Sequence, residues 1–106
     1  IAGTNTTLGL IATNANLSKA QLKKVAEMAH DGMARAIRPI HTQFDGDTVF
    51  AVSMPGSAVE TTTDAEAQLN SISIAGAKAL ELAIVDAVRS AKSVGDVVAC
   101  CDWRIN

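Results

Sequence analysis

The segment from Thr63 to about Lys92 constrains the fold most, because its apolar residues fall on nearly every side of a helix. It opens with a capping-box pattern at 63–66, in which a hydroxyl side chain and an acidic side chain bind each other's backbone N–H groups. Only a narrow polar strip remains on this helix, made of Lys78, Glu81, Arg89 and Lys92. A helix that is apolar nearly all round is buried rather than amphipathic. We therefore expect other elements to cover most of it.

Two short strands and one other helix precede that segment. Residues Thr6–Ala12 are β-branched and aliphatic and predict a buried strand. A capping box at Ser18–Gln21 opens a helix with apolar residues every three or four positions, which Pro39 stops. Residues Asp47–Met54 predict a second strand, ended by the turn signal Pro55-Gly56. The order β-α-β-α predicts an α/β layer arrangement.

The predicted strands are too few to bury the predicted helices. A chain of 106 residues makes one domain at most, and two short strands cannot cover the long helix on most of its faces. Gly76, in the middle of that helix, costs about 1 kcal/mol relative to Ala, which predicts a close crossing with a helix or a sheet. We expect the chain to complete a sheet that another chain supplies.

Composition excludes several classes of protein. With 48% hydrophobic and 19% charged residues the chain does not match the disordered signature. A net charge of −2 and the lack of any basic run argue against nucleic-acid binding, and no apolar run is long enough to span a membrane. Residues 1–5 do not resemble a signal peptide, and the adjacent Cys100 and Cys101 are too close for a comfortable disulfide. We expect a cytoplasmic protein.

Reactive side chains gather in three places, at Asn5-Thr6-Thr7, at His30-Asp31 and from His41 to Asp47. Asp45 and Asp47 stand two apart before a strand, so both carboxylates could point to one face. The alternative is an ordinary Asp-Gly-Asp turn. The His and Asp residues match no known metal-ligand spacing, and we expect no metal and no cofactor.

Three segments together resemble one family closely: Asn5–Leu8, Met28–Pro39 and His41–Ala51. It is the DmpA-like family of self-processing amidases and aminopeptidases, which includes β-aminopeptidases and nylon-oligomer hydrolases. The likeness covers roughly residues 4–92. Members are made as one precursor that cuts itself into a larger α chain and a smaller β chain. The resemblance implies an αββα-type sandwich like that of N-terminal-nucleophile hydrolases, which this chain completes together with the larger chain.

Carried over by position, the resemblance makes Thr6 the nucleophile and Asn5–Thr6 the bond that the precursor cuts. Residues 1–5 would then end the precursor linker, and 6–106 would be the β chain. Asp45 and Asp47 fall where the family has two polar or acidic residues facing the nucleophile. Many aminopeptidase members have Ser as nucleophile with Ser and Glu at those two sites, so Thr with two Asp residues is more similar to the nylon-oligomer (6-aminohexanoate oligomer) hydrolases.

The implied chemistry is acyl transfer. A Thr hydroxyl needs a base, and cutting before Thr6 leaves it a free α-amine with a reference pKa of about 7.7–8.0. Before the cut another base must act, and Asp45 and Asp47 are the candidates. The chain offers no convincing oxyanion donor, and the resemblance implies that an Asn and a Lys of the larger chain contribute to the site, in an assembly of four or more αβ units.

Two alternatives stay open. The protein could be an aminopeptidase of the same family, acting on L-amino-acid or β-amino-acid substrates, or a non-catalytic assembly subunit whose apolar helix reports only packing. The expected substrates are small amides or short peptides.

Overall fold

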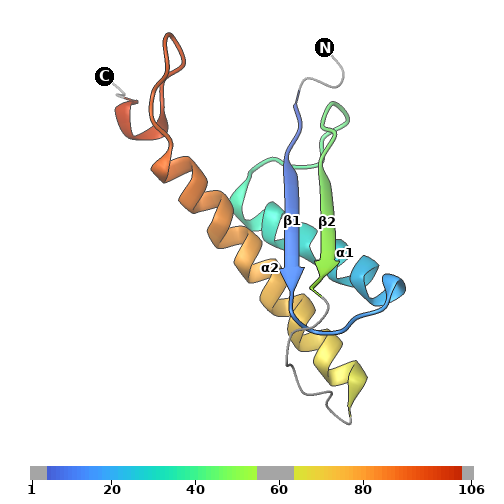
Figure 1. Cartoon of the computed structure of the whole chain (residues 1–106). Coiled ribbons are helices and arrows are strands. Elements are labelled where there is room, and N and C mark those ends of the chain that lie inside the picture. The colour runs from blue at the N-terminus through green and yellow to red at the C-terminus, as the bar shows by residue number, and fades with distance from the viewer. Residues whose placement is uncertain (1–4, 55–63, 104–106) are drawn as a thin grey trace.

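Two parallel strands lie on one side of two helices in the computed structural model, which describes residues 5–54 and 64–103 (Figure 1). Strand β1 spans Leu8–Thr13, helix α1 Lys19–Ala36, strand β2 Thr48–Ser53 and helix α2 Ala65–Ser90. A short 3-10 helix, Cys100–Asp102, follows. The predicted α/β class and the order β-α-β-α are confirmed.

The sheet has one covered face and one bare face. β1 and β2 pair in register from Leu8 opposite Thr48 to Thr13 opposite Ser53, and α1 connects them. Because side chains alternate along a strand, Gly9 and Ile11 face the helices and are buried, whereas Leu8 is 71% exposed. The bare face also presents Leu10, Phe50 and Val52. Large apolar side chains in this number on a sheet face are typical of a surface that something else covers.

Helix α1 forms as the sequence predicts. Ser18 is the N-cap, its hydroxyl accepts the Gln21 N–H at 3.2 Å, and the Gln21 side chain accepts the Ser18 N–H at 2.8 Å. The buried stripe follows helical spacing and consists of Val25, Ala29, Gly32 and Met33. The helix ends at Ala36, before Pro39, because the residue that precedes a proline is disfavoured in helical conformation.

Helix α2 begins one residue later than the sequence analysis predicts. Its N-cap is Asp64, whose carboxylate accepts the Ala67 N–H at 3.0 Å, so the box predicted to start at Thr63 is wrong in register. The helix ends at Ser90 rather than near Lys92. Within this chain it buries only Ser73, Gly76, Ala77 and Leu80, so the expectation of a buried helix is not met by the elements of this chain alone.

The two helices touch most closely at Gly32 of α1. A Cβ atom at Gly32 would lie 1.9 Å from the carbonyl oxygen of Ala77, far inside contact distance. Gly76, where a close crossing was predicted, is buried against Ile11 and Val25, but a Cβ there would stay at 3.4 Å or more from every neighbour. The close crossing therefore exists one residue further along α2.

Three further predictions concern the rest of the chain. The turn signal Pro55-Gly56 and the polar loop that follows lie outside the described residues, as do residues 1–4. Cys100 and Cys101 are free and exposed. In the described part of the chain, neither helix is both long and apolar enough to cross a membrane.

Candidate active site

The segments with reactive side chains meet where both strands begin. Asn5 forms an isolated parallel bridge with Asp45, and the strands start with Leu8 opposite Thr48. The pairing offset is the same at both points, so the register runs on without a bulge. Thr6 consequently lies opposite Gly46, and Thr7 lies opposite Asp47. Segments forty residues apart in the sequence thus form one site at this end of the sheet.

A cavity of about 300 Å³ opens at this point. Its apolar wall comes from the residues after α1, namely Ile37, Pro39 and Ile40. Its polar wall comes from the two paired segments and consists of Asn5, Thr6, Thr7, Thr42, Asp45 and Asp47. The structure therefore brings together all four residues that the resemblance assigns to the site. A cavity with one apolar wall and a few convergent polar groups is the usual form of a small-molecule site.

The backbone of Gly46 holds the peptide group before Thr6. Its N–H donates to the carbonyl oxygen of Asn5 at 2.8 Å, and its own carbonyl accepts the Thr48 hydroxyl at 3.2 Å. The Thr6 hydroxyl lies directly beside it, because a Cβ atom at Gly46 would be 3.1 Å from Thr6 Oγ1. The Gly46 residue therefore approaches both groups at the Asn5–Thr6 bond, the Asn5 carbonyl through its N–H and the Thr6 hydroxyl by close packing.

Asp47 is the most strongly held side chain of the site and is only 2% exposed. Its Oδ1 accepts the Thr7 N–H at 3.0 Å, and its Oδ2 accepts both the backbone N–H of His41 at 3.2 Å and the His41 ring Nδ1 at 3.0 Å. Burial of the carboxyl raises the pKa of Asp47, but the bonds from Thr7 and His41 together outweigh burial and hold it below the ordinary value of 3.8.

Asp45 combines the turn and the site interpretations. Its N–H donates to the Thr42 carbonyl at 3.0 Å and its Oδ2 accepts the Thr42 N–H at 3.1 Å, which closes a turn before the paired segment. Its Oδ1 accepts no hydrogen bond from any residue that the structure describes. One oxygen of Asp45 therefore stays available at the cavity, in contrast to both oxygens of Asp47.

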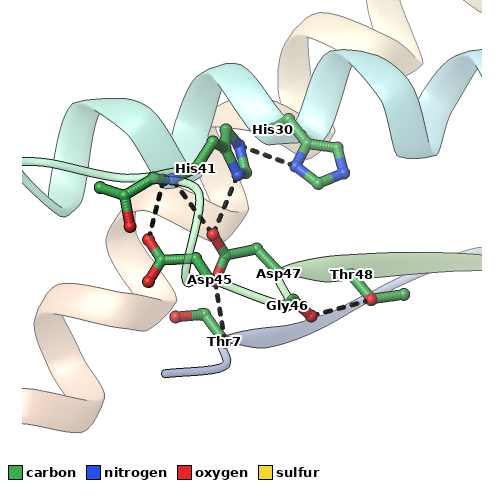
Figure 2. Close-up of polar contacts among 8 residues, drawn as sticks. Thr7, His30, His41, Asp45, Gly46, Asp47 and Thr48 are labelled. Carbon is green, nitrogen blue, oxygen red and sulfur yellow. Dashed lines mark hydrogen bonds and ion pairs between the residues drawn. The ribbon is translucent and has the colours of Figure 1, made fainter. Parts of the chain in front are cut away.

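Three groups beside the site are not assigned a role by the residue pattern. The Gly46 N–H went unnoticed because a backbone donor leaves no signature in residue type. His30 and His41 were noted as reactive but given no role, and Figure 2 shows His41 between His30 and Asp47. The His30 Nδ1 and His41 Nε2 atoms are 3.1 Å apart. Asp31, grouped with His30 in the sequence, is exposed and stays outside this network.

No group of three or more metal-ligating side chains suited to a metal ion occurs among residues 5–54 and 64–103. His30, His41 and Asp47 form a linear network, in which His41 contacts both His30 and Asp47.

Comparison with known proteins identifies the family. The model of peptidase family S58 matches residues 2–99. The chain belongs to this family. The resemblance found from the three segments is thereby confirmed.

Aminopeptidases and 6-aminohexanoate-oligomer endohydrolases are both among the proteins similar to this chain. An uncharacterized aminopeptidase of Mycobacterium leprae is 39% identical over 95% of this chain, and one of Mycobacterium tuberculosis is 41% identical over 88%. A 6-aminohexanoate-oligomer endohydrolase of Paenarthrobacter ureafaciens is 47% identical over 46% of this chain. The matched part of this chain spans 30% of the length of the M. leprae protein, 29% of the M. tuberculosis protein and 14% of the endohydrolase.

Proposed function

We propose that this chain is the smaller part of a self-processed amide hydrolase in which Thr6 becomes the N-terminal nucleophile. One observation carries the proposal: the Gly46 N–H binds the Asn5 carbonyl at 2.8 Å while the Thr6 hydroxyl lies beside Gly46. A backbone donor already bound to this carbonyl oxygen is aimed at the atom on which negative charge develops during attack. Membership in a peptidase family supports amide bonds as the target.

In the precursor, Thr6 Oγ1 attacks the carbonyl carbon of Asn5. The hydroxyl proton passes to a base, and negative charge gathers on the Asn5 oxygen, where the Gly46 N–H stabilises it. The C–N bond then breaks, and the proton moves to the departing Thr6 nitrogen. This leaves an ester between Asn5 and the Thr6 oxygen. Water hydrolyses the ester to a free Asn5 carboxyl and a Thr6 hydroxyl with a free α-amine.

Asp45 is the better candidate for the base in the precursor. The three hydrogen bonds on Asp47 and its lowered pKa make it a poor proton acceptor near neutral pH. Asp45 keeps an oxygen without a hydrogen bond in the described structure and borders the same cavity as Thr6. Asp47 instead fixes the backbone at Thr7. The two carboxylates thus take different roles.

After the cut the same groups act on a substrate. Departure of Asn5 frees the Gly46 N–H, and a substrate carbonyl takes the place of the Asn5 carbonyl. The new α-amine of Thr6 accepts the hydroxyl proton, since its reference pKa lies near neutral pH. Thr6 Oγ1 forms an ester with the acyl part and the amine product leaves with the proton. Water then releases the acid.

The apolar wall of Ile37, Pro39 and Ile40 favours substrates with an apolar group next to the amide. Both the methylene chain of a 6-aminohexanoate oligomer and an apolar amino-acid side chain meet this description, in line with the two kinds of name among the relatives. Rates on an end-blocked 6-aminohexanoate oligomer and on amino-acid p-nitroanilides distinguish the two. Cleavage of the blocked oligomer supports an endohydrolase, and cleavage of the anilides alone supports an aminopeptidase.

We also propose that the remainder of the precursor, as a larger α chain, covers the bare sheet face and the outer side of α2. The exposed Leu8, Leu10 and Phe50 on the sheet support this, as do Ile74 and Leu82 on the helix. The relatives' greater length leaves enough chain for such a layer.

The test uses the protein expressed from its full-length coding sequence. Thr6→Ala removes the attacking hydroxyl, so the precursor should stay whole and amide hydrolysis should disappear. Thr6→Ser keeps a hydroxyl at the same place and should still process itself. Full activity in the Thr6→Ala variant would contradict the proposal and favour a non-catalytic subunit.

A further inference from the structure

His41 holds the Asp47 carboxylate without bordering the cavity. The residues that line the cavity include Asp47 but neither His41 nor His30. Yet two of the three hydrogen bonds to the Asp47 carboxylate come from His41, one from its backbone N–H and one from its ring. Its ring lies in turn against that of His30, with the ring centres 4.7 Å apart. The proposed reaction as described above uses neither histidine.

The conformation of His41 is what lets both donors reach one oxygen. Its φ is 58°, in the left-handed region, where His, Asn and Asp are enriched among residues other than Gly. In this conformation the backbone N–H and the ring Nδ1 both bind Oδ2 of Asp47. A residue that cannot adopt a positive φ without strain would lose this arrangement even if it carried a donor.

The contact is transmitted to Thr6 through the backbone. With Oδ2 held by His41, the other oxygen of Asp47 is directed at the Thr7 N–H, at 3.0 Å. That N–H belongs to the peptide group whose carbonyl is part of Thr6. The chain of contacts therefore runs from His30 through His41 and Asp47 to the peptide that carries the nucleophile (Figure 2).

The hydrogen-bond contacts determine which ring nitrogens carry hydrogens. The ionised Asp47 carboxylate can only accept, so the His41 Nδ1 carries a hydrogen. Between His41 Nε2 and His30 Nδ1, one nitrogen donates and the other accepts. These assignments follow from the network itself.

We propose that His41 is a positioning residue for the Thr6 site, which it serves by fixing the Asp47 carboxylate that holds the Thr7 N–H, while His30 fixes the His41 ring. The inference rests on the proposed role of Thr6 as nucleophile. Misplacement of a reacting group by about 1 Å can cost about a hundredfold in rate. Loss of the His41 contacts should therefore slow the chemical step and leave substrate binding largely unchanged.

The experiment compares two replacements that both tolerate a positive φ, in the full-length protein. His41→Gly removes the ring without backbone strain. His41→Asn keeps a side-chain N–H that can reach Asp47. Asp31→Asn, at the exposed neighbour of His30, is the matched control. The readouts are the first-order rate of self-cleavage, which needs no substrate, and kcat and KM on whichever probe the wild type cleaves, the blocked 6-aminohexanoate oligomer or an amino-acid p-nitroanilide.

We expect His41→Gly to lower the self-cleavage rate and kcat by about 10- to 100-fold with KM little changed, His41→Asn to recover most of the loss, and Asp31→Asn to match the wild type. Equal losses in His41→Gly and His41→Asn would overturn the proposal. An unchanged self-cleavage rate and kcat in His41→Gly would also overturn it. If Thr6→Ala is inactive at the same time, the proposed role of Thr6 is kept and only the role of His41 is lost. An active Thr6→Ala variant would instead remove the proposed function itself.

If His41→Gly does not fold, His30→Ala provides the test, because it leaves both contacts between His41 and Asp47 in place. The proposal then expects a smaller fall in kcat at unchanged KM and unchanged melting temperature. A wild-type kcat in this variant would contradict it.

Discussion

At the scale of single residues, Asp47 is held by its neighbours rather than by solvent. Three N–H groups bind its almost fully buried carboxylate. One is the backbone N–H of Thr7, and the other two are the backbone N–H and the ring Nδ1–H of His41. Such an arrangement favours the ionised carboxylate over the neutral acid. The same bonds that position the site should therefore also contribute to the stability of the fold in a manner that depends on pH.

Asp47→Asn tests that dependence. Since the folded-state pKa of Asp47 lies below its ordinary value of 3.8, its stabilising contribution is fully present above the unfolded-state pKa and is lost as pH falls through the folded-state pKa. The variant should melt at a lower temperature than the wild type at about pH 6 to 7, and the difference should shrink towards about pH 3. Thermal unfolding at a series of pH values measures it.

The matched control for this prediction is Asp31→Asn, which removes an exposed carboxylate on α1 that lies outside the hydrogen-bond network of His30, His41 and Asp47. Its melting curve should follow that of the wild type at each pH. A constant difference between Asp47→Asn and the wild type over the whole range would show that the ionised form is not the stabilising one.

Residue type explains which parts of the site could be predicted. Thr6, Asn5, Asp45 and Asp47 were assigned from a resemblance, and the structure gathers them around one cavity, although their chemical roles stay predictions. The Gly46 donor could not be predicted, because every residue except proline offers an N–H. The link between His30 and His41 depends on how the loop after α1 returns to the helix. No spacing pattern in the sequence encodes that return.

At the scale of elements, the crossing of α1 and α2 depends on one glycine. A Cβ atom at Gly32 would meet backbone atoms of Ala77, which cannot move out of the way as a side chain can. At Gly76 the neighbouring atoms are side-chain carbons of Ile11 and Val25 at 3.4 Å and 3.6 Å, an ordinary contact distance. Two glycines in the same pair of helices thus have opposite tolerance for a methyl group.

We predict that Gly32→Ala destabilises the protein by about 1–3 kcal/mol, because the helices must move apart. Gly76→Ala should be neutral or stabilise by up to about 1 kcal/mol, since Ala is the better helix former. Denaturant unfolding of the two variants compares the same substitution in both helices. Equal stability of Gly32→Ala and Gly76→Ala would contradict the close approach at Gly32.

Local sequence patterns predict where the helices lie better than they predict which residue caps a helix or what covers it. The Ser18–Gln21 capping box marks the start of α1 correctly, because its two bonds form within four residues. At α2 two adjacent residues, Thr63 and Asp64, could each serve as N-cap, and the pattern selected the wrong one. The apolar circumference of α2 predicts a cover over most of the helix, and the described elements of this chain bury only Ser73, Gly76, Ala77 and Leu80.

At the scale of the whole molecule, the chain is less compact than an independent domain of its length. Its radius of gyration is 16.6 Å, whereas about 13 Å is typical of a compact domain of this size. Figure 1 shows α2 running well past the two-stranded sheet, with the other face of the sheet open. An elongated shape with a bare apolar sheet face supports our proposal that the chain shares its domain with a larger partner.

The central claim is that a cut between Asn5 and Thr6 creates the nucleophile. Intact-mass analysis under denaturing conditions of the active protein, purified from its full-length coding sequence, tests it most directly. We predict two polypeptides, of which the smaller begins at Thr6. A fully active protein in which the Asn5–Thr6 bond is intact would contradict the account.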